Sequence, residues 1–414
     1  MQKYVVWGTG NYAHKLIDNF LHLIDYIEVF LDHDLNKSNL EGISIVRPDD
    51  WGNYEDYIIV ICVQNFFGEI YNELIHKHHV KKENIISAHE WICRLLSEGK
   101  VKLYPRSVRL EACTLCQLDC AYCYMRLENY SATGCGYLKF RNFEKFITEN
   151  PQINQVEISN SGEVFLNPDL KEILLLADQK NIEITISGGA NFNDVSDEIL
   201  ELLVKTQVSH ITISIDGASQ EKYSIYRRKG NFDKVISNIK KLNEYKEKHN
   251  SVYPILTWKY ILMQHNECDV EKAAIMAKEL NMRISYVFDC VKDEFMPQDK
   301  VKLEKVTGLK YFTRKEYNQK HWRQFGDQFC YQSIFNPQIN YDGRLLGCCM
   351  IWREDYGINV FEQGLLNSLN SEGYLRMIRL LLGIEQPTEE LGEIPCLHCV
   401  LWGRNYREKN HVYL

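Results

Sequence analysis

The chain has 414 residues, of which 45% are hydrophobic and 25% are charged, and its formal net charge is −8. This length suggests roughly two to three domains, and the composition is typical of globular proteins that bury a core. The net negative charge argues against a nucleic-acid-binding protein, because such proteins usually carry a basic face.

The distribution of apolar residues gives no sign of export or of membrane insertion. The N-terminal sequence has no apolar segment followed by a small-residue cleavage site, and no apolar run reaches the length of a membrane span. We therefore expect a cytoplasmic protein without membrane contact. In a reducing compartment, the fourteen cysteines are better explained by metal or redox chemistry than by disulfide bonds.

Residues 1–93 alternate between predicted strands and helices. "YVVWG" (4–8), "IEVFLD" (27–32) and "YIIVICV" (57–63) are strand-like, and amphipathic stretches follow the first and the third. Because alternation of this kind indicates a parallel sheet, we predict an α/β domain with a Rossmann-like fold over residues 1–93.

The turn after the first strand is a candidate nucleotide site. Gly8 and Gly10 permit a tight turn, so that a phosphate can approach the N-terminus of the following helix. Asp32 ends the second strand at the spacing where an acidic residue binds a ribose hydroxyl in dinucleotide-binding folds. Domains of this kind can also be purely structural. Nucleotide binding and a structural or dimer role therefore both stay open.

After a connector at residues 94–106, the pattern changes to repeated strand–helix units. Such units form a barrel or an open parallel sheet, in which functional groups collect at the C-terminal ends of the strands. A cysteine-rich segment follows the first strand of this series. The predicted strands span residues 107–112, 155–159, 182–187, 210–215, 255–262 and 284–288.

The segment "CTLCQLDCAYC" (113–123) holds four cysteines. One hypothesis is a structural zinc site that uses all four. Zinc-binding pairs are usually separated by a dozen or more residues, whereas only three residues separate the two pairs here. The other hypothesis uses Cys116, Cys120 and Cys123, whose spacing lets one loop hold three irons of a cubane cluster. The fourth iron then stays open, and Cys113 is not a ligand.

This C-x3-C-x2-C motif, with Tyr122 before its last cysteine, resembles the motif of the radical S-adenosylmethionine (SAM) superfamily. "SNSGEVFLNPDL" (159–170), residues 213–242 and residues 258–280 resemble further segments of that family. The resemblance implies a partial (β/α)6 barrel over residues 107–325. It also implies a SAM-binding [4Fe–4S] cluster and reductive cleavage of SAM to a 5′-deoxyadenosyl radical, which abstracts a hydrogen atom from the substrate.

The same resemblance implies a set of SAM contacts. The family usually has two glycines before its glutamate, and Ser161 stands at the first of these positions here. The implied contacts are Gly162 and Glu163 to the methionyl amino group, Ser214 to the ribose and Arg227 or Arg228 to the carboxylate, with Tyr122 as a further cofactor-binding residue.

Residues 326–414 contain a second set of cysteines. "YDGRLLGCC" predicts a hairpin with Asp342-Gly343 as its turn. A structural zinc site is one hypothesis, and a second cluster with full cysteine ligation is the other. The segment resembles the SPASM/twitch extension of radical SAM enzymes, and its five cysteines suit the shorter twitch type with one auxiliary [4Fe–4S] cluster. The implied ligands are Cys330, Cys348, Cys396 and Cys399, with Cys349 as the alternative to Cys348.

A barrel with a twitch segment resembles enzymes that oxidise sugars and aminocyclitols, and also peptide maturases. No segment resembles the winged-helix leader-binding domain of many maturases, and a nucleotide-binding-type fold is expected at the N-terminus instead. We therefore favour oxidation or epimerisation of a small polar substrate, such as a sugar or nucleotide-linked sugar. A peptide or protein substrate is the alternative, and a non-catalytic iron–sulfur sensor or scaffold is the third hypothesis. The implied partner is an electron donor such as flavodoxin or ferredoxin; the oligomeric state is not predicted.

The last predicted barrel strand (284–288) is followed by two candidate catalytic residues, Asp289 and Cys290. A thiol at Cys290 could return a hydrogen atom to a substrate radical, which would make the protein an epimerase. Asp289 could instead accept a substrate proton, which would suit a dehydrogenase that uses the second cluster as electron acceptor. The alternative is that Cys290 packs in the core, as cysteines outside disulfides often do.

Overall fold

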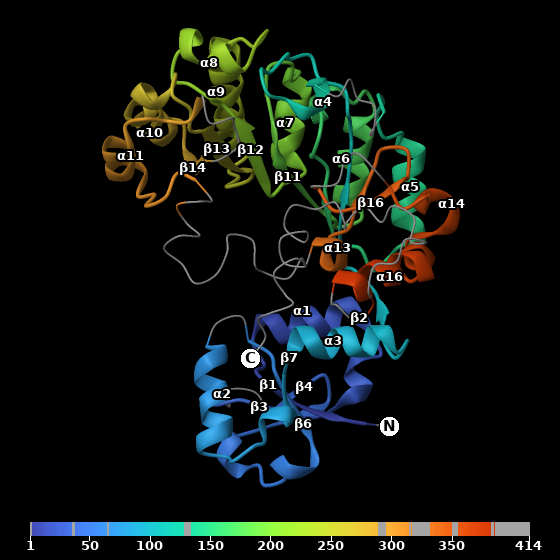
Figure 1. Cartoon of the computed structure of the whole chain (residues 1–414). Coiled ribbons are helices and arrows are strands. Elements are labelled where there is room, and N and C mark those ends of the chain that lie inside the picture. Colours follow the sequence, from blue (N-terminus) through green and yellow to red (C-terminus); the bar gives the residue numbers. More distant parts are fainter. Residues whose placement is uncertain are drawn as a thin grey trace. The chain divides into compact units, whose positions relative to one another are not determined.

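The computed structural model describes residues 2–34, 38–63, 66–127, 134–288, 295–313, 316, 332–349, 355–381 and 385. The chain forms two compact units (Figure 1). The first contains Met1–Arg106 together with the helices that begin at Leu365, and the second contains Ser107–Gly364. Among the described residues, no helix combines the length and the apolar character that a membrane span requires.

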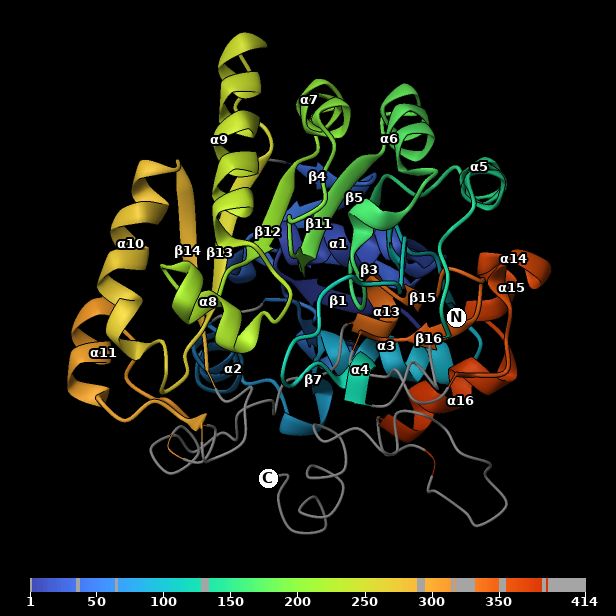
Figure 2. The same cartoon turned by 90° about the horizontal axis from the view of Figure 1, so that it is seen from above.

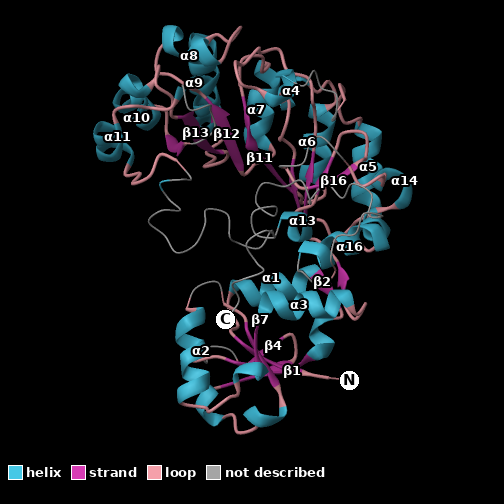
Figure 3. Ribbon diagram, viewed as in Figure 1, coloured by secondary structure: helices cyan, strands magenta, loops and turns pink. Residues whose placement is uncertain are grey.

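The first unit is built on a mostly parallel sheet with helices α1, α2 and α3 (Figure 3). The strand order is β4-β5-β3-β1-β6-β7, and β4 runs antiparallel to β5. The two short strands β2 and β8 pair with each other. The elements are β1 Tyr4–Trp7, α1 Asn11–Asn19, β2 Phe20–Leu21, β3 Ile27–Leu31, β4 Asn39–Leu40, β5 Ile43–Val46, β6 Ile58–Ile61, α2 Phe67–His76, β7 Ile85–Ser87, α3 Ala88–Ser97 and β8 Lys102–Leu103.

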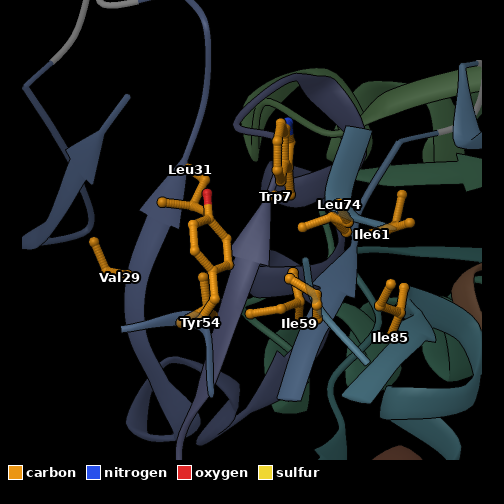
Figure 4. Packing of buried hydrophobic residues seen from close by; sticks show 10 residues of the cluster. Trp7, Val29, Leu31, Tyr54, Ile59, Ile61, Leu74 and Ile85 are labelled. Carbon is orange, nitrogen blue, oxygen red and sulfur yellow. The ribbon is translucent and has the colours of Figure 1, made fainter. Parts of the chain in front are cut away.

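Apolar side chains from neighbouring strands form the core of this unit (Figure 4). Trp7, Leu31, Ile59 and Ile61 are each at most 2% exposed. The sequences "YVVW" and "IIVI" are continuous apolar runs, as expected for strands of a parallel sheet that is covered on both faces. The three predicted strands of this region are confirmed as β1, β3 and β6.

The glycine turn after β1 is tightly enclosed by its neighbours. Gly8 has a φ of 118°, and a Cβ atom there would lie 2.6 Å from the carbonyl oxygen of Cys62. The carboxylate Oδ2 of Asp32 accepts hydrogen bonds from the Thr9 amide, at 2.8 Å, and from the Thr9 hydroxyl, at 2.6 Å. Asp32 therefore ties the turn to the end of β3.

Gly8→Ala is expected to destabilise the first unit by about 2 kcal/mol or more, because alanine disfavours this φ and its methyl group would meet a backbone oxygen. Gly10→Ala in the same turn is the matched control, because a Cβ atom at Gly10 would have no atom within 4 Å. The control should cost about 1 kcal/mol at most, the penalty of a poorer helix cap. Thermal unfolding of the full chain measures both, and equal losses would contradict the steric explanation.

Two helices from the C-terminal part of the chain belong to the first unit. The side-chain amide of Asn370, between α15 (Leu365–Leu369) and α16 (Glu372–Leu381), accepts from the Leu103 N–H at 2.8 Å and donates to the Leu103 carbonyl at 2.9 Å. Tyr374 and Met377 on α16 are fully buried. The predicted boundary at residue 93 falls inside α3, and the unit continues through the predicted connector 94–106.

The second unit is an open sheet in which β9 to β14 run parallel in chain order. The complete order is β14-β13-β12-β11-β10-β9-β15-β16, with β15 parallel to β9 and β16 antiparallel to β15. Figure 2 shows α5, α6, α7, α9 and α10 along one side of these strands. The strands are β9 Ser107–Leu110, β10 Gln155–Glu157, β11 Glu183–Ala190, β12 His210–Ser214, β13 Ile255–Ile261, β14 Met282–Val287, β15 Gln338–Ile339 and β16 Leu345–Gly347. The helices are α4 Tyr124–Leu127, α5 Phe140–Glu149, α6 Leu170–Gln179, α7 Asp197–Lys205, α8 Gln220–Tyr226, α9 Phe232–Lys248, α10 Val270–Glu279, α11 Lys300–Thr307, α13 Gln332–Phe335 and α14 Val360–Gln363.

Both the repeated strands and the later hairpin agree with the sequence prediction. Each of the six predicted strands overlaps one of β9 to β14. The predicted hairpin is formed by β15 and β16, and Gly343 in its turn has a φ of 93°. Cys348 follows β16 and is buried. The other predicted ligands of a second cluster, Cys330, Cys396 and Cys399, lie outside the described residues.

Candidate functional site

The cysteine-rich loop follows β9 and is fastened to two other loops by backbone hydrogen bonds. The amides of Asp119 and Ala121 donate to the carbonyls of Arg228 and Tyr226, at 3.0 and 3.1 Å. The Glu163 amide, in the loop after β10, donates to the Leu115 carbonyl at 2.7 Å. The loop is therefore held at the C-terminal edge of the sheet, where parallel α/β folds collect functional groups.

The thiols of Cys116, Cys120 and Cys123 form one group within this loop, and all three residues are half-buried. Burial raises the pKa of Cys116 to about 12, and the charges of Glu163, Cys120 and Cys123 raise it further. The three residues share one loop, so that a single segment of the chain presents all three thiols. Three grouped thiols on one loop are a suitable ligand set for an iron–sulfur cluster.

The fourth cysteine of the segment stands apart. Cys113 is fully buried, and its Sγ lies 3.8 Å from the Leu115 carbonyl oxygen. Burial raises its pKa to about 12. Full burial of Cys113, beside three cysteines that are half-buried, agrees with the hypothesis in which Cys113 is not a ligand.

Aromatic and aliphatic side chains cover the cysteine loop. The ring of Tyr122 lies 6.0 Å from that of Tyr226 and 4.7 Å from that of Phe295. Cys120 and Tyr122 also pack against the buried Ile261 and Met263 side chains. These contacts would shield a cluster from water on this side, and solvent exposure is one determinant of a cluster's reduction potential.

Gly162 and Glu163 lie directly against the cysteine segment. A Cβ atom at Gly162 would be 2.3 Å from the Cys113 carbonyl oxygen, so only glycine permits this close approach. The Glu163 side chain is 1% exposed, and one of its oxygens accepts from the Asn191 amide at 2.6 Å. Burial raises the pKa of Glu163 to about 7, while hydrogen bonds from two backbone amides oppose the increase.

Asn191 is a residue of this site that the sequence analysis missed. Its side-chain amide lies 3.6 Å from the Cys116 sulfur and exchanges two hydrogen bonds with the side chain of Gln117, at 3.0 and 3.1 Å. Its position in the sequence could have indicated it, because Asn191 directly follows β11 at the edge of the sheet that carries the cysteine loop.

The structure distinguishes the two neighbouring arginines. Arg227 Nη1 lies 3.6 Å from the Cys120 sulfur, and Arg227 Nε donates to Asp216 Oδ2 at 2.6 Å. Arg228 is exposed. Arg227 is therefore the arginine that reaches the cysteine loop, and Asp216, which the sequence analysis also missed, is its partner.

Ser214 is the last residue of β12 and is buried. A Cβ atom added at Gly189 would lie 2.7 Å from the hydroxyl oxygen of Ser214. Glycine at position 189 therefore leaves room beside this hydroxyl group. Asp289 and Cys290 lie outside the described residues, which end on this side of the gap at Phe288, after β14. Their catalytic roles stay predictions. Gly8, Gly10 and Asp32 belong to the first compact unit.

A second buried carboxyl group, Glu111, supports the loop after β10. Its oxygens accept from the amides of Ser161, at 2.9 Å, and Asn160, at 3.4 Å. Burial raises its pKa from 4.5 to about 7. A carboxyl group whose pKa is higher in the folded than in the unfolded state favours folding while it is protonated. This contribution to stability is present at low pH and is lost as the pH rises through the folded-state pKa.

Glu111→Gln should therefore change stability in a pH-dependent way. Between pH 5 and pH 8 the stability of the variant, relative to wild type, should rise by about 2.5 kcal/mol, because glutamine carries no charge to desolvate. Denaturant unfolding of the full chain without metal, at each pH, measures the difference. A difference that is constant with pH would contradict the raised pKa of Glu111.

The fold and the site together define an α/β protein with a three-cysteine cluster loop at the C-terminal edge of a parallel sheet. A family profile described as "Radical SAM superfamily" matches residues 110–276, which contain this loop. These residues, which are less than half of the chain, are therefore similar to the radical SAM domain.

Curated relatives and one solved structure are similar to larger parts of the chain. The AdoMet-dependent heme synthase of Methanosarcina barkeri is 27% identical over 221 residues, or 51% of this chain and 59% of the relative. The sporulation killing factor maturation protein SkfB of Bacillus subtilis is 26% identical over 190 residues, or 42% and 44%. The chain thus spans about half the length of these relatives. The crystal structure of Streptococcus suis SuiB bound to S-adenosylmethionine shares the fold, with a TM-score of 0.53, 15% identity and 82% of each chain covered.

Proposed function

We propose that the protein is a radical SAM enzyme, which cleaves SAM reductively and uses the resulting 5′-deoxyadenosyl radical to take a hydrogen atom from its substrate. The observation that carries this proposal is the grouping of Cys116, Cys120 and Cys123 on one loop, at the functional edge of a domain similar to that superfamily. The heme synthase relative is named as AdoMet-dependent, which agrees with SAM as the cofactor.

The proposal assigns separate tasks to the residues around the loop. The three cysteines hold three irons, and the cluster, when bound, supplies the electron that cleaves SAM. Glu163 receives the SAM ammonium group, Ser214 the ribose and Arg227 the carboxylate, while Tyr122 and its apolar neighbours exclude water. The contact of Gly162 with Cys113 holds Glu163 against the cysteine loop.

A peptide or protein is the better supported substrate. SkfB is named as a maturation protein, and another SuiB structure is described as bound to the precursor peptide SuiA. The small polar substrate that the sequence favoured, a sugar or nucleotide-linked sugar, has no such support among these relatives. A small-molecule substrate is the second candidate. It is supported by the heme synthase relative, whose name refers to a small molecule and not to a peptide.

The substrate class can be tested without knowing the substrate. The reconstituted full chain, SAM and a reductant are added to an extract of deuterium-grown cells of the encoding organism, and deuterium in 5′-deoxyadenosine is measured. The added SAM carries ¹³C in its adenosyl group, so that deuterium in ¹³C-labelled 5′-deoxyadenosine comes only from a C–D bond of a molecule in the extract. If proteinase treatment of the extract abolishes the transfer, the substrate is a peptide or protein. Transfer that survives proteinase and passes a 1-kDa filter would contradict this.

We also propose a second [4Fe–4S] cluster held by Cys330, Cys348, Cys396 and Cys399. The hairpin of β15 and β16 places Cys348 at its end and supports this assignment. Anaerobic reconstitution should give about eight irons per chain, the sum for two cubanes. An iron content of about four per wild-type chain would contradict the proposed second cluster. It would also contradict the role of that cluster as an electron acceptor.

For the first compact unit we propose a Rossmann-like domain, supported by its parallel strand order β5-β3-β1-β6-β7 and its glycine turn. The hydrogen bonds from Thr9 to Asp32 favour a structural role for that carboxylate, because a ribose would have to replace them. Calorimetric titration of the full chain with NAD and nucleoside diphosphate sugars distinguishes this role from nucleotide binding.

A further inference from the structure

The guanidinium of Arg227 lies beside the sulfur of Cys120. Its Nη1 lies 3.6 Å from the Cys120 sulfur, within the range of an N–H···S hydrogen bond, and its side chain is 14% exposed. A guanidinium at this distance acts on the sulfur both as a hydrogen-bond donor and as a nearby positive charge.

Asp216 fixes the orientation of that guanidinium. Asp216 is fully buried, and its Oδ2 accepts from Arg227 Nε at 2.6 Å. The other oxygen, Oδ1, accepts from the backbone N–H of Ile261 at the end of β13, at 2.7 Å. The ring of Tyr226 lies 5.1 Å from the guanidinium carbon. With Nε engaged by Asp216, Nη1 of Arg227 faces the Cys120 sulfur.

We infer that the Asp216–Arg227 pair sets the reduction potential of the cluster bound by Cys116, Cys120 and Cys123, an inference that rests on the proposed function. Arg227 donates to the Cys120 sulfur, and Asp216 is the positioning residue. Reduction adds one electron to the cluster, so a cation that donates to a ligand sulfur stabilises the reduced form and raises the potential. Hydrogen bonds to sulfur and burial are established determinants of cluster potentials, and a low local dielectric strengthens both effects.

The test is a redox titration without SAM, followed by electron paramagnetic resonance. It measures the midpoint potential of the signal that disappears when Cys116, Cys120 and Cys123 are replaced by alanine. Arg227→Gln should lower the equilibrium constant for reduction at least tenfold, which is 59 mV for a one-electron couple. Arg227→Lys should lower it less, since lysine keeps the charge but loses the planar fork. Arg228→Gln is the matched control, because it removes the same charge from an exposed neighbour, and it should leave the potential unchanged.

A second variant covers the case in which Arg227→Gln loses its cluster because Asp216 is left buried without its partner. Asp216→Asn with Arg227→Gln removes both charges, and the asparagine side chain can still accept from the Ile261 N–H. This double variant should bind the cluster and also show a lowered potential. A wild-type potential in either iron-loaded variant would overturn the inference. Failure of the proposed function is a different result, namely a wild-type protein that binds its cluster and SAM but does not cleave SAM.

Discussion

Replacing Cys116, Cys120 and Cys123 together by alanine is expected to abolish SAM cleavage and to remove about four irons per chain. The reason is that the proposed function assigns these thiols as the protein ligands of one cubane cluster, and thiolates are the groups that hold such clusters. Iron and sulfide analysis after anaerobic reconstitution measures the loss, and chromatography of 5′-deoxyadenosine measures the activity.

Cys113→Ala is the matched control for this prediction, because Cys113 belongs to the same segment but is fully buried and is not a proposed ligand. It should keep the iron content of the wild type. Loss of four irons in the Cys113 variant, or SAM cleavage by the triple variant, would show that the three-ligand assignment is wrong.

Glu163→Gln is expected to weaken SAM binding at least about tenfold while leaving the iron content unchanged. A charge-assisted hydrogen bond to an ammonium group would be lost, and each 1.4 kcal/mol corresponds to a factor of ten in affinity. Glutamine can still accept a hydrogen bond from the Asn191 amide, so the loop after β10 should persist. Equilibrium dialysis of labelled SAM against reconstituted protein measures the affinity.

Glu111→Gln provides the control for Glu163. Both carboxyl groups are buried, and burial raises the pKa of each to about 7. Glu111 engages the amides of Asn160 and Ser161 and is not a proposed SAM contact. Equal losses of SAM affinity in the two variants would indicate a general effect of buried charge and would remove Glu163 from the SAM site.

The parts of the fold that the sequence predicted are those with strong local patterns. The six strands β9 to β14 of the second unit lie in apolar stretches separated by helical stretches, and the cysteine spacing marks the loop on its own. The strand β5, "ISIV", was missed because it is short and flanked by polar residues, and β7 was missed for the same reason. The addition of α15 and α16 to the first unit depends on contacts with residues far away in sequence, such as Asn370 with Leu103.

In the candidate site, too, local sequence patterns were predicted and contacts between distant residues were not. Cysteine spacing and family resemblance indicated the loop and Glu163, but two adjacent arginines could not be distinguished by sequence alone. The difference arises from α8, which ends at Tyr226 and leaves Arg227 facing Asp216 and Arg228 exposed. Asn191 and Asp216 carry no motif of their own. Their importance follows from the ends of β11 and β12 meeting at one edge of the sheet.

The measurement that tests the central claim most directly is the formation of 5′-deoxyadenosine by the reconstituted wild-type protein with SAM and a strong reductant under anaerobic conditions. The account predicts 5′-deoxyadenosine and methionine in equal amounts, with none formed when the reductant is omitted or when Cys116, Cys120 and Cys123 are replaced. Intact SAM after incubation with fully iron-loaded, reduced wild-type protein would contradict the account.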